Sequence, residues 1–183
     1  RFQCKQRTRY GKSYGLPNDQ VRALHEDRAG VMWIGLNGRA LAQWNRKEFV
    51  VVPVPEDGPA SVVDFCEDRE GGMWLAGDGL WYFKDGEFTN LDRKMGLRPQ
   101  RFTSVRESRD GSIWVGSMRG LLRFQGSDVR TYLEADGLSD DQVRALHLDR
   151  EGNLWIGTSS GLDRFRDCRF TPCLTKDHAP YDL

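Results

Sequence analysis

The sequence predicts an all-β fold made of four consecutive repeats, and three observations support this. Tryptophan recurs with spacings of 41, 40 and 41 residues, each time in almost the same local sequence. Short β-prone runs alternate with turn residues, and no stretch has the apolar period of an amphipathic helix. A period of this size indicates a repeat architecture, in which one unit buries its apolar face only against a neighbour. The recurring residues are Trp33, Trp74, Trp114 and Trp155.

Each repeat begins with a strand and a tight turn. Apolar residues stand twelve and nine positions before each tryptophan, as Val143 and Leu146 do in the fourth repeat. A turn of the form Asp-Arg-x-Gly follows, in which the aspartate accepts from backbone N–H groups and glycine supplies positive φ. Ser108 replaces the aspartate in the third repeat. The fourfold occurrence of this turn favours a structural role, because a catalytic site needs one convergent set of groups.

The tryptophan lies in a second strand, and two further strands complete each repeat. A Gly-Leu turn leads into a third run such as 120–124, and a weaker fourth run follows, such as 128–132. The first repeat departs from this pattern at 38–44, and the second is one residue shorter at the same place. Four short strands in about forty residues are typical of one blade of a β-propeller. Stacked blades cover both faces of the inner strands, which explains the near-continuous apolar runs.

We therefore expect a β-propeller of four four-stranded blades that is a fragment of a larger ring. The blades are expected at residues 20–53, 61–91, 102–132 and 143–173, with a tail or linker at 174–183. Residues 1–10 are expected to be the remnant of a preceding blade, because Tyr10 aligns with Tyr132 when Arg1-Phe-Gln is matched to Arg123-Phe-Gln. An open arc exposes apolar blade faces at its ends, so we expect contact with the remaining blades or self-association of the fragment.

The repeated tryptophans are expected to be largely buried anchors between blades. Burying one indole removes roughly 200 Å² from water, worth very roughly 5 kcal/mol before entropy is subtracted. We expect Trp33, Trp74, Trp114 and Trp155 to serve in this way. Trp155→Ala is then expected to cost about 3–5 kcal/mol.

The repeat resembles that of a known family. The pattern Val-x-Ala-Leu-x2-Asp-x2-Gly-x2-Trp-Ile-Gly-Thr-x2-Gly-Leu-x-Arg-Phe, which follows Gly137-Leu138 and ends at Phe165, resembles the two-component regulator propeller repeat. Ala76 and Gly77 disturb it in the second repeat. The resemblance implies a periplasmic sensor module of a bacterial two-component or diguanylate cyclase signalling protein. Such modules precede a second β-domain, a membrane span and an output domain.

The charge balance argues against polyanionic partners. Lys plus Arg and Asp plus Glu number 27 each, so no net field attracts the chain to nucleic acid or to an anionic membrane. No apolar run approaches the roughly 20 residues of a membrane span, and we expect no membrane contact by this segment.

No metal or cofactor is expected. The cysteines Cys4, Cys66, Cys168 and Cys173 share no repeat position, and the spacing of the last two fits no Cys-x2-Cys zinc pattern. A disulfide or buried free thiols both remain open. The histidines His25, His147 and His178, with scattered aspartates, make no metal-binding pattern.

Two features are candidates for ligand binding. The heptapeptide Asp-Gln-Val-Arg-Ala-Leu-His occurs at 19–25 and 141–147, through repeat duplication or because Arg22 and Arg144 hold a carboxylate or sugar hydroxyls from innermost strands. Trp81 and Tyr82 follow a shortened turn, where they either stack on a sugar at the blade rim or pack internally.

Three function classes follow. The first is a non-catalytic sensor that binds a small extracellular molecule, with oligosaccharides implied by the resemblance, or the following domain of its parent protein. It would signal by population shift. The second is a propeller enzyme, a lyase or glycan hydrolase, for which no convincing catalytic set is seen. The third is a protein-interaction scaffold. Fold resemblance carries much of this choice.

Overall fold

The computed structural model describes residues 8–98, 100–166 and 169–172, which form four antiparallel sheets of four strands each. Within every sheet, strands adjacent in sequence are hydrogen-bonded neighbours. The first sheet contains β1 (Val21–Glu26), β2 (Met32–Leu36), β3 (Ala40–Trp44) and β4 (Phe49–Val52). The second contains β5 (Val62–Glu67), β6 (Met73–Gly77), β7 (Leu80–Lys84) and β8 (Glu87–Asn90). The third contains β9 (Phe102–Glu107), β10 (Ile113–Ser117), β11 (Gly120–Gln125) and β12 (Asp128–Tyr132). The fourth contains β13 (Val143–Leu148), β14 (Leu154–Thr158), β15 (Leu162–Arg166) and β16 (Arg169–Pro172).

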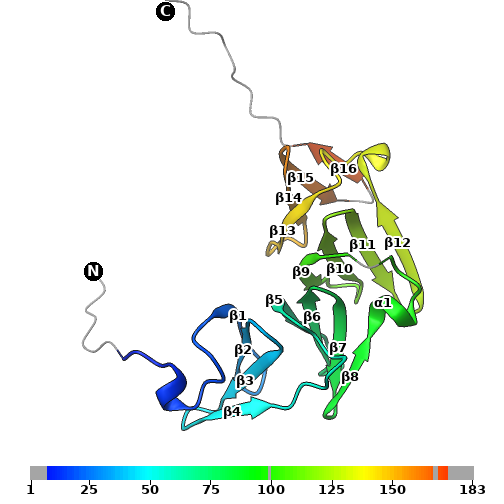
Figure 1. Ribbon diagram of the computed structural model, residues 1–183. Helices are drawn as coiled ribbons and strands as arrows, with labels where there is room; N and C mark the ends of the chain where they lie inside the picture. Colours follow the sequence, from blue (N-terminus) through cyan, green and yellow to red (C-terminus); the bar gives the residue numbers. More distant parts are fainter. Residues whose placement is uncertain (1–7, 99, 167–168, 173–183) are drawn as a thin grey trace, which may run out of the picture.

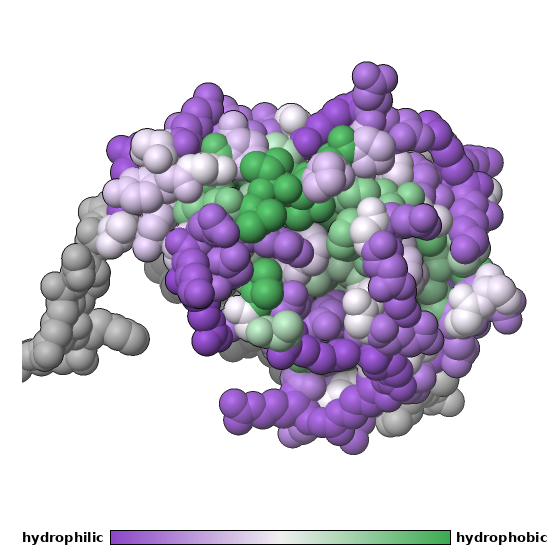
Figure 2. All heavy atoms as spheres, turned by 90° about the horizontal axis from the view of Figure 1, so that it is seen from below, coloured by the Kyte–Doolittle hydropathy of each residue, from purple (hydrophilic) through white to green (hydrophobic). Residues whose placement is uncertain are grey.

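The sheets follow one another along an arc (Figure 1). The first strand of each sheet borders the concave side, and consecutive first strands contact one another from β1 through β5 and β9 to β13. The first and fourth sheets stand at the two ends of the arc, and the described residues do not close a ring. Seen from below, hydrophobic residues show in several places between the hydrophilic side chains that cover most of this face (Figure 2).

A bulge recurs in the inner strand of every sheet. The register shifts between Val21 and Ala23 in the first sheet and between Val143 and Ala145 in the fourth. Corresponding shifts occur where β5 pairs with β6 and where β9 pairs with β10. A bulged residue has no place in the ladder, so its side chain is aimed differently from those of its neighbours. The bulged residues are Arg22, Val63, Thr103 and Arg144.

The core lies between consecutive sheets, because each sheet buries its apolar face against the next. One hydrophobic cluster joins the first and second sheets, another the second and third, and another the third and fourth. A further cluster around Leu16, Ile34 and Leu36 belongs to the first sheet. This arrangement explains why the repeated tryptophans recur once per sheet.

Helix is confined to single turns. The helix α1 (Leu91–Lys94) follows β8, and the side chain of its N-cap Asn90 accepts a hydrogen bond from the Arg93 backbone N–H. Asp92 accepts from the Leu80 backbone N–H at 2.7 Å, which fixes α1 to β7. Two 3₁₀ turns, η1 (Lys12–Tyr14) and η2 (Glu134–Asp136), precede the first and fourth sheets.

The predicted terminal segments are described only in part. Of the blade remnant expected at residues 1–10, the structure describes 8–10. The tail expected at 174–183 lies outside the described residues. Among the residues that the structure describes, no helix is both long and apolar enough to span a membrane.

Candidate functional site

The turn before three of the four anchor tryptophans fixes the indole by a hydrogen bond. Asp27, Asp68 and Asp149 each accept a hydrogen bond from the indole Nε1 of the following tryptophan at 2.8–3.0 Å. The second carboxylate oxygen accepts from backbone N–H groups two and four residues ahead. Hydrogen bonds from the Asn153 side chain and the Trp155 indole hold the pKa of Asp149 below its usual range.

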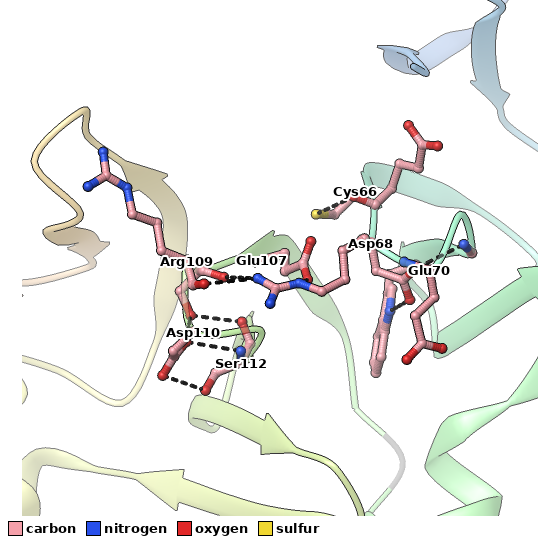
Figure 3. A network of polar contacts seen from close by, with 12 residues as sticks. Cys66, Asp68, Glu70, Glu107, Arg109, Asp110 and Ser112 are labelled. Carbon is pink, nitrogen blue, oxygen red and sulfur yellow. Dashed lines mark hydrogen bonds and ion pairs between the residues drawn. The ribbon is translucent and has the colours of Figure 1, made fainter. Parts of the chain in front are cut away.

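The third turn is closed by different residues (Figure 3). Asp110 accepts from the backbone N–H of Ser112 at 3.0 Å and from Arg123 Nη2 at 2.7 Å. Burial raises the pKa of Asp110, but hydrogen bonds from Ser108 and Ser112 and the charge of Arg123 together lower this pKa to about 2. The carboxylate has moved two positions along the turn, which compensates for Ser108 in place of aspartate.

The turn arginines join each sheet to the next. Arg28 Nη1 donates to the Asp68 carbonyl oxygen at 2.8 Å. Arg69 Nε donates to Glu107 Oε1 at 2.7 Å, and its Nη2 donates to the Arg109 carbonyl oxygen at 3.0 Å. The Arg109 guanidinium in turn donates to the Arg150 carbonyl oxygen in the fourth turn. These contacts give the turns the structural role expected from their repetition.

The two arginines of the repeated heptapeptide occupy bulge positions on β1 and β13. Both side chains are exposed. Their strands border the concave side of the arc, with β5 and β9 between them (Figure 1). Arg144 Nε donates to Ser159 Oγ at 2.9 Å, and its Nη2 donates to Gln142 Oε1 at 3.1 Å. The structure therefore orients Arg144, and it places β5 and β9 between the strands of the two arginines.

An ion pair lies on β5 and β9, the inner strands between β1 and β13. Asp64 Oδ2 and Arg106 Nη1 are 2.5 Å apart, and they link β5 to β9. Sequence analysis did not single out this pair. The sequence does mark the pair, because Asp64 and Arg106 differ in type from the residues at the equivalent positions of the first sheet. Those residues are Ala23 and His25. We use the name inner-strand polar group for Arg22, Asp64, Arg106 and Arg144.

Neighbouring titratable side chains are shielded from water. His25 Nε2 is buried and has no hydrogen-bond partner in the described structure. Burial lowers the pKa of His25, which favours its neutral form. Burial also raises the pKa of the Cys66 thiol to about 11, so the thiol stays protonated at neutral pH.

Trp81 and Tyr82 lie on opposite faces of β7. Consecutive strand residues point to opposite sides, and Trp81 is buried between the first and second sheets at 7% exposure. Tyr82 packs against Trp74, toward the third sheet. Burial and the Asp68 carboxylate raise the pKa of Tyr82 to about 12. The two rings therefore form no common stacking surface.

The anchor tryptophans differ in burial. Trp33 and Trp114 are buried, whereas Trp74 and Trp155 are partly exposed. Within the described residues, no group of three or more His, Cys, Asp or Glu side chains is arranged to hold a metal ion.

Two segments, residues 15–38 and 137–160, match the family described as two component regulator propeller. The chain carries two-component regulator propeller repeats. The matched segments contain β1–β2 and β13–β14, and thus Arg22, Arg144, Trp33 and Trp155. No curated protein sequence matches the chain.

Several solved structures resemble the arc. The extracellular domain of BT4673 from B. thetaiotaomicron, described as a hybrid two component system, is 18% identical with a TM-score of 0.71, over 83% of this chain and 22% of that one. The corresponding domain of BT3049 from the same organism is 21% identical with a TM-score of 0.62, over 90% and 31%. Virginiamycin B lyase from Staphylococcus aureus is 14% identical with a TM-score of 0.68, over 86% and 56%.

These likenesses show that the four sheets are arranged as in β-propellers. The chain spans about a fifth to a third of the two-component domains it resembles.

Proposed function

We propose that this chain is part of the periplasmic sensor propeller of a bacterial two-component or diguanylate cyclase signalling protein, without catalytic activity of its own. One observation carries the proposal. Sequences of the two-component regulator propeller family occupy both end sheets of an arc that resembles extracellular domains of two-component systems.

In this proposal the four sheets are four blades of a larger ring. Their boundaries are those expected from the sequence, 20–53, 61–91, 102–132 and 143–173. The remaining blades and the following domain of the parent protein are then the first partners of the arc. The exposed apolar side chains of the first sheet, Val21 at 45% and Leu24 at 64% exposure, support the view that the arc is incomplete.

The ligand site we propose lies along the concave side, at the inner-strand polar group. Arg144 is held by Ser159 and Gln142, so its guanidinium is oriented before a ligand arrives. A planar guanidinium suits a carboxylate or paired hydroxyls. An oligosaccharide that carries a carboxylate offers both groups.

Signalling follows if binding changes how blades pack on one another. A ligand that contacts two inner strands favours the packing in which both strands can reach it, and it shifts the population toward that state. Asp64 and Arg106 already connect two sheets at this side. Because their ion pair joins β5 to β9, a change in how the second and third sheets pack would alter it.

Calorimetry with an oligogalacturonide, and with a neutral galactan of the same length, tests the binding site. The acidic sugar is expected to bind, and replacing Arg22 and Arg144 together by alanine is expected to weaken it at least about tenfold, the loss of one charge-assisted contact. Arg93→Ala is the matched control, because Arg93 is exposed on α1, away from the concave side. Equal affinity in the double variant would refute the site.

The coding sequence downstream of Leu183 tests the function class. A membrane span followed by a kinase or diguanylate cyclase domain is expected. A stop codon there, or a catalytic domain on the same side of the membrane, would overturn the sensor proposal.

A propeller enzyme is the second candidate, favoured by the likeness to virginiamycin B lyase. Incubating the protein with quinupristin, with which a neighbouring lyase structure was solved, and following its conversion by mass spectrometry distinguishes the two. The sensor proposal expects no turnover.

A further inference from the structure

An open cavity of about 380 Å³ lies between the second and third sheets, neither of which stands at an end of the arc. Small-molecule sites in proteins usually have volumes of roughly 300–1,000 Å³. The cavity is lined by the turn of the second sheet, by α1 and by three aromatic side chains. The aromatic side chains are those of Trp74, Tyr82 and Phe124.

Trp74 is partly exposed at this cavity, in contrast to two of its counterparts. Trp33 and Trp114 are 5% and 3% exposed. Trp74 differs from them even though a described sheet lies on each side of its own sheet. The exposure of Trp74 is therefore a property of this boundary and does not come from a missing neighbour.

An aromatic residue stands beside Trp74 where the third sheet has an arginine. Arg123 is paired with Trp114 in the register of β10 and β11, and its guanidinium lies 5.1 Å from the centre of that indole. The comparable cavity between the third and fourth sheets, of about 410 Å³, is lined by this guanidinium. Tyr82 is the equivalent residue of the second sheet, and it packs edge to face against Trp74. The cavity between the second and third sheets therefore has an aromatic wall where the next boundary places a cation.

The turn of the second sheet is shaped for Tyr82. A Cβ atom at Gly72 would lie 1.8 Å from the Tyr82 hydroxyl oxygen, so a larger residue does not fit there. The other turns carry side chains at this position, namely Val31, Ser112 and Asn153. Gly72 and Tyr82 are therefore one coordinated departure from the repeat, and together they fix where the aromatic wall lies.

The helix α1 forms a further wall, and the other two boundaries of the described chain contain no α-helix. Leu91 and Lys94 lie in α1, Met95 follows it, and all three line the cavity. The exposed indole, the glycine–tyrosine pair and α1 all depart from the repeat, and the other boundaries stack without them. Their meeting at one cavity indicates a function other than stacking.

The rim of the cavity offers charges of both signs. Lys94 is exposed and forms no ion pair with any described residue. Glu70 is 75% exposed, and its ion pair with Lys84 is long, at 3.8 Å. Arg69 and Glu107, by contrast, pair with each other across the boundary at 2.7 Å. A ligand therefore meets one free ammonium and one weakly paired carboxylate.

We propose that this cavity binds a dipeptide with apolar side chains. Its carboxylate pairs with Lys94, its ammonium pairs with Glu70, and a side chain packs against the aromatic wall. A ligand of one charge would meet a like charge at this rim, whereas a zwitterion makes a charge-assisted hydrogen bond to each group. Lys94 and Glu70 form no ion pair with each other in the described chain, so a gap separates them. The two residues of a dipeptide span up to about 7 Å, which suits such a gap.

Calorimetry on the full chain tests the ligand class with phenylalanyl-leucine and two derivatives. The N-acetyl derivative lacks the ammonium, and the C-terminal amide lacks the carboxylate. The dipeptide is expected to bind, and each derivative is expected to bind at least about tenfold more weakly, because it loses one charge-assisted contact. No binding of the dipeptide, or equal binding of all three compounds, would overturn the proposal.

Lys94→Gln tests the position of the carboxylate. Because Lys94 is exposed, the variant should fold, and circular dichroism checks this. The variant should bind the dipeptide about tenfold more weakly and should bind the amide as the wild type does, since the amide has no carboxylate to lose. Arg93→Gln is the matched control, because Arg93 is the exposed neighbour on α1 and does not line the cavity. Wild-type affinity of Lys94→Gln for the dipeptide, or an equal loss for dipeptide and amide, would contradict this pairing.

The concave-side site gives an independent comparison, because the inner-strand polar group shares no residue with this cavity. Arg22→Ala together with Arg144→Ala should leave the affinity for phenylalanyl-leucine unchanged. Loss of dipeptide binding in that double variant, with native circular dichroism, would place the dipeptide on the concave side and overturn its assignment to the cavity.

Discussion

The carboxylate of Asp64 and the guanidinium of Arg106 meet at 2.5 Å between Oδ2 and Nη1, across the boundary of the second and third sheets. The same Oδ2 accepts from the backbone N–H of Val105 at 3.0 Å. At the equivalent place in the first sheet, Ala23 packs in the apolar cluster shared with the second sheet. The fold therefore uses a polar link at one boundary where its neighbour uses apolar contact.

Asp64→Ala is expected to lower the free energy of unfolding by about 1–3 kcal/mol. The change removes a partly buried ion pair and leaves the Val105 N–H and Arg106 without their acceptor. Urea denaturation followed by tryptophan fluorescence measures it. The exposed pair of Arg93 and Asp57, at 3.9 Å, provides the control, because Arg93→Ala should cost less than about 0.5 kcal/mol. Equal losses in the two variants would contradict the structural role of Asp64.

The anchor tryptophans should differ in their contribution to stability. Trp114→Ala is expected to cost about 3–5 kcal/mol, because its ring is buried against Phe165 and Tyr132. The sequence led us to expect the same for Trp155→Ala. Since Trp155 is partly exposed, we now expect only about 1–2 kcal/mol in the single chain. Unfolding is measured at concentrations where the chain is monomeric, and equal losses would mean that Trp155 is covered.

The periodic features of this protein were predictable, and the exceptions were not. Strands, turns and the once-per-repeat tryptophan follow from local spacing, so four copies of the pattern reinforce one another. The pairing of Asp64 with Arg106 depends on two strands that meet only after the sheets have stacked. The partial exposure of Trp155 depends on what lies beside the last sheet, which no repeat encodes. The opposed directions of Trp81 and Tyr82 follow from their strand, once its bounds are known.

Cys66 should react slowly with thiol reagents in the folded protein. Burial raises its pKa to about 11, so at pH 8 only on the order of a thousandth of the thiol is ionised. Labelling with iodoacetamide is expected to be slow in buffer and fast in urea. The measurement needs Cys4, Cys168 and Cys173 replaced by serine, so that one thiol is followed. Rapid labelling of the folded protein would show that Cys66 is accessible and activated.

Stability should fall in acid as the third turn loses its carboxylate. The folded-state pKa of Asp110 is about 2, below the value near 3.9 of an unfolded chain. A group whose pKa is lowered by folding stabilises the protein above the unfolded value and loses that contribution as pH falls toward the folded value. The contribution of Asp110 should therefore disappear between about pH 4 and pH 2.

Urea midpoints across this range should decline less steeply for Asp110→Asn than for the wild type. Because Asp110 is half exposed and Arg123 remains able to reach water, the difference should be modest and should shrink at high salt. Identical slopes in the two proteins would show that the hydrogen bonds from Ser108 and Ser112 do not hold this carboxylate in its charged form.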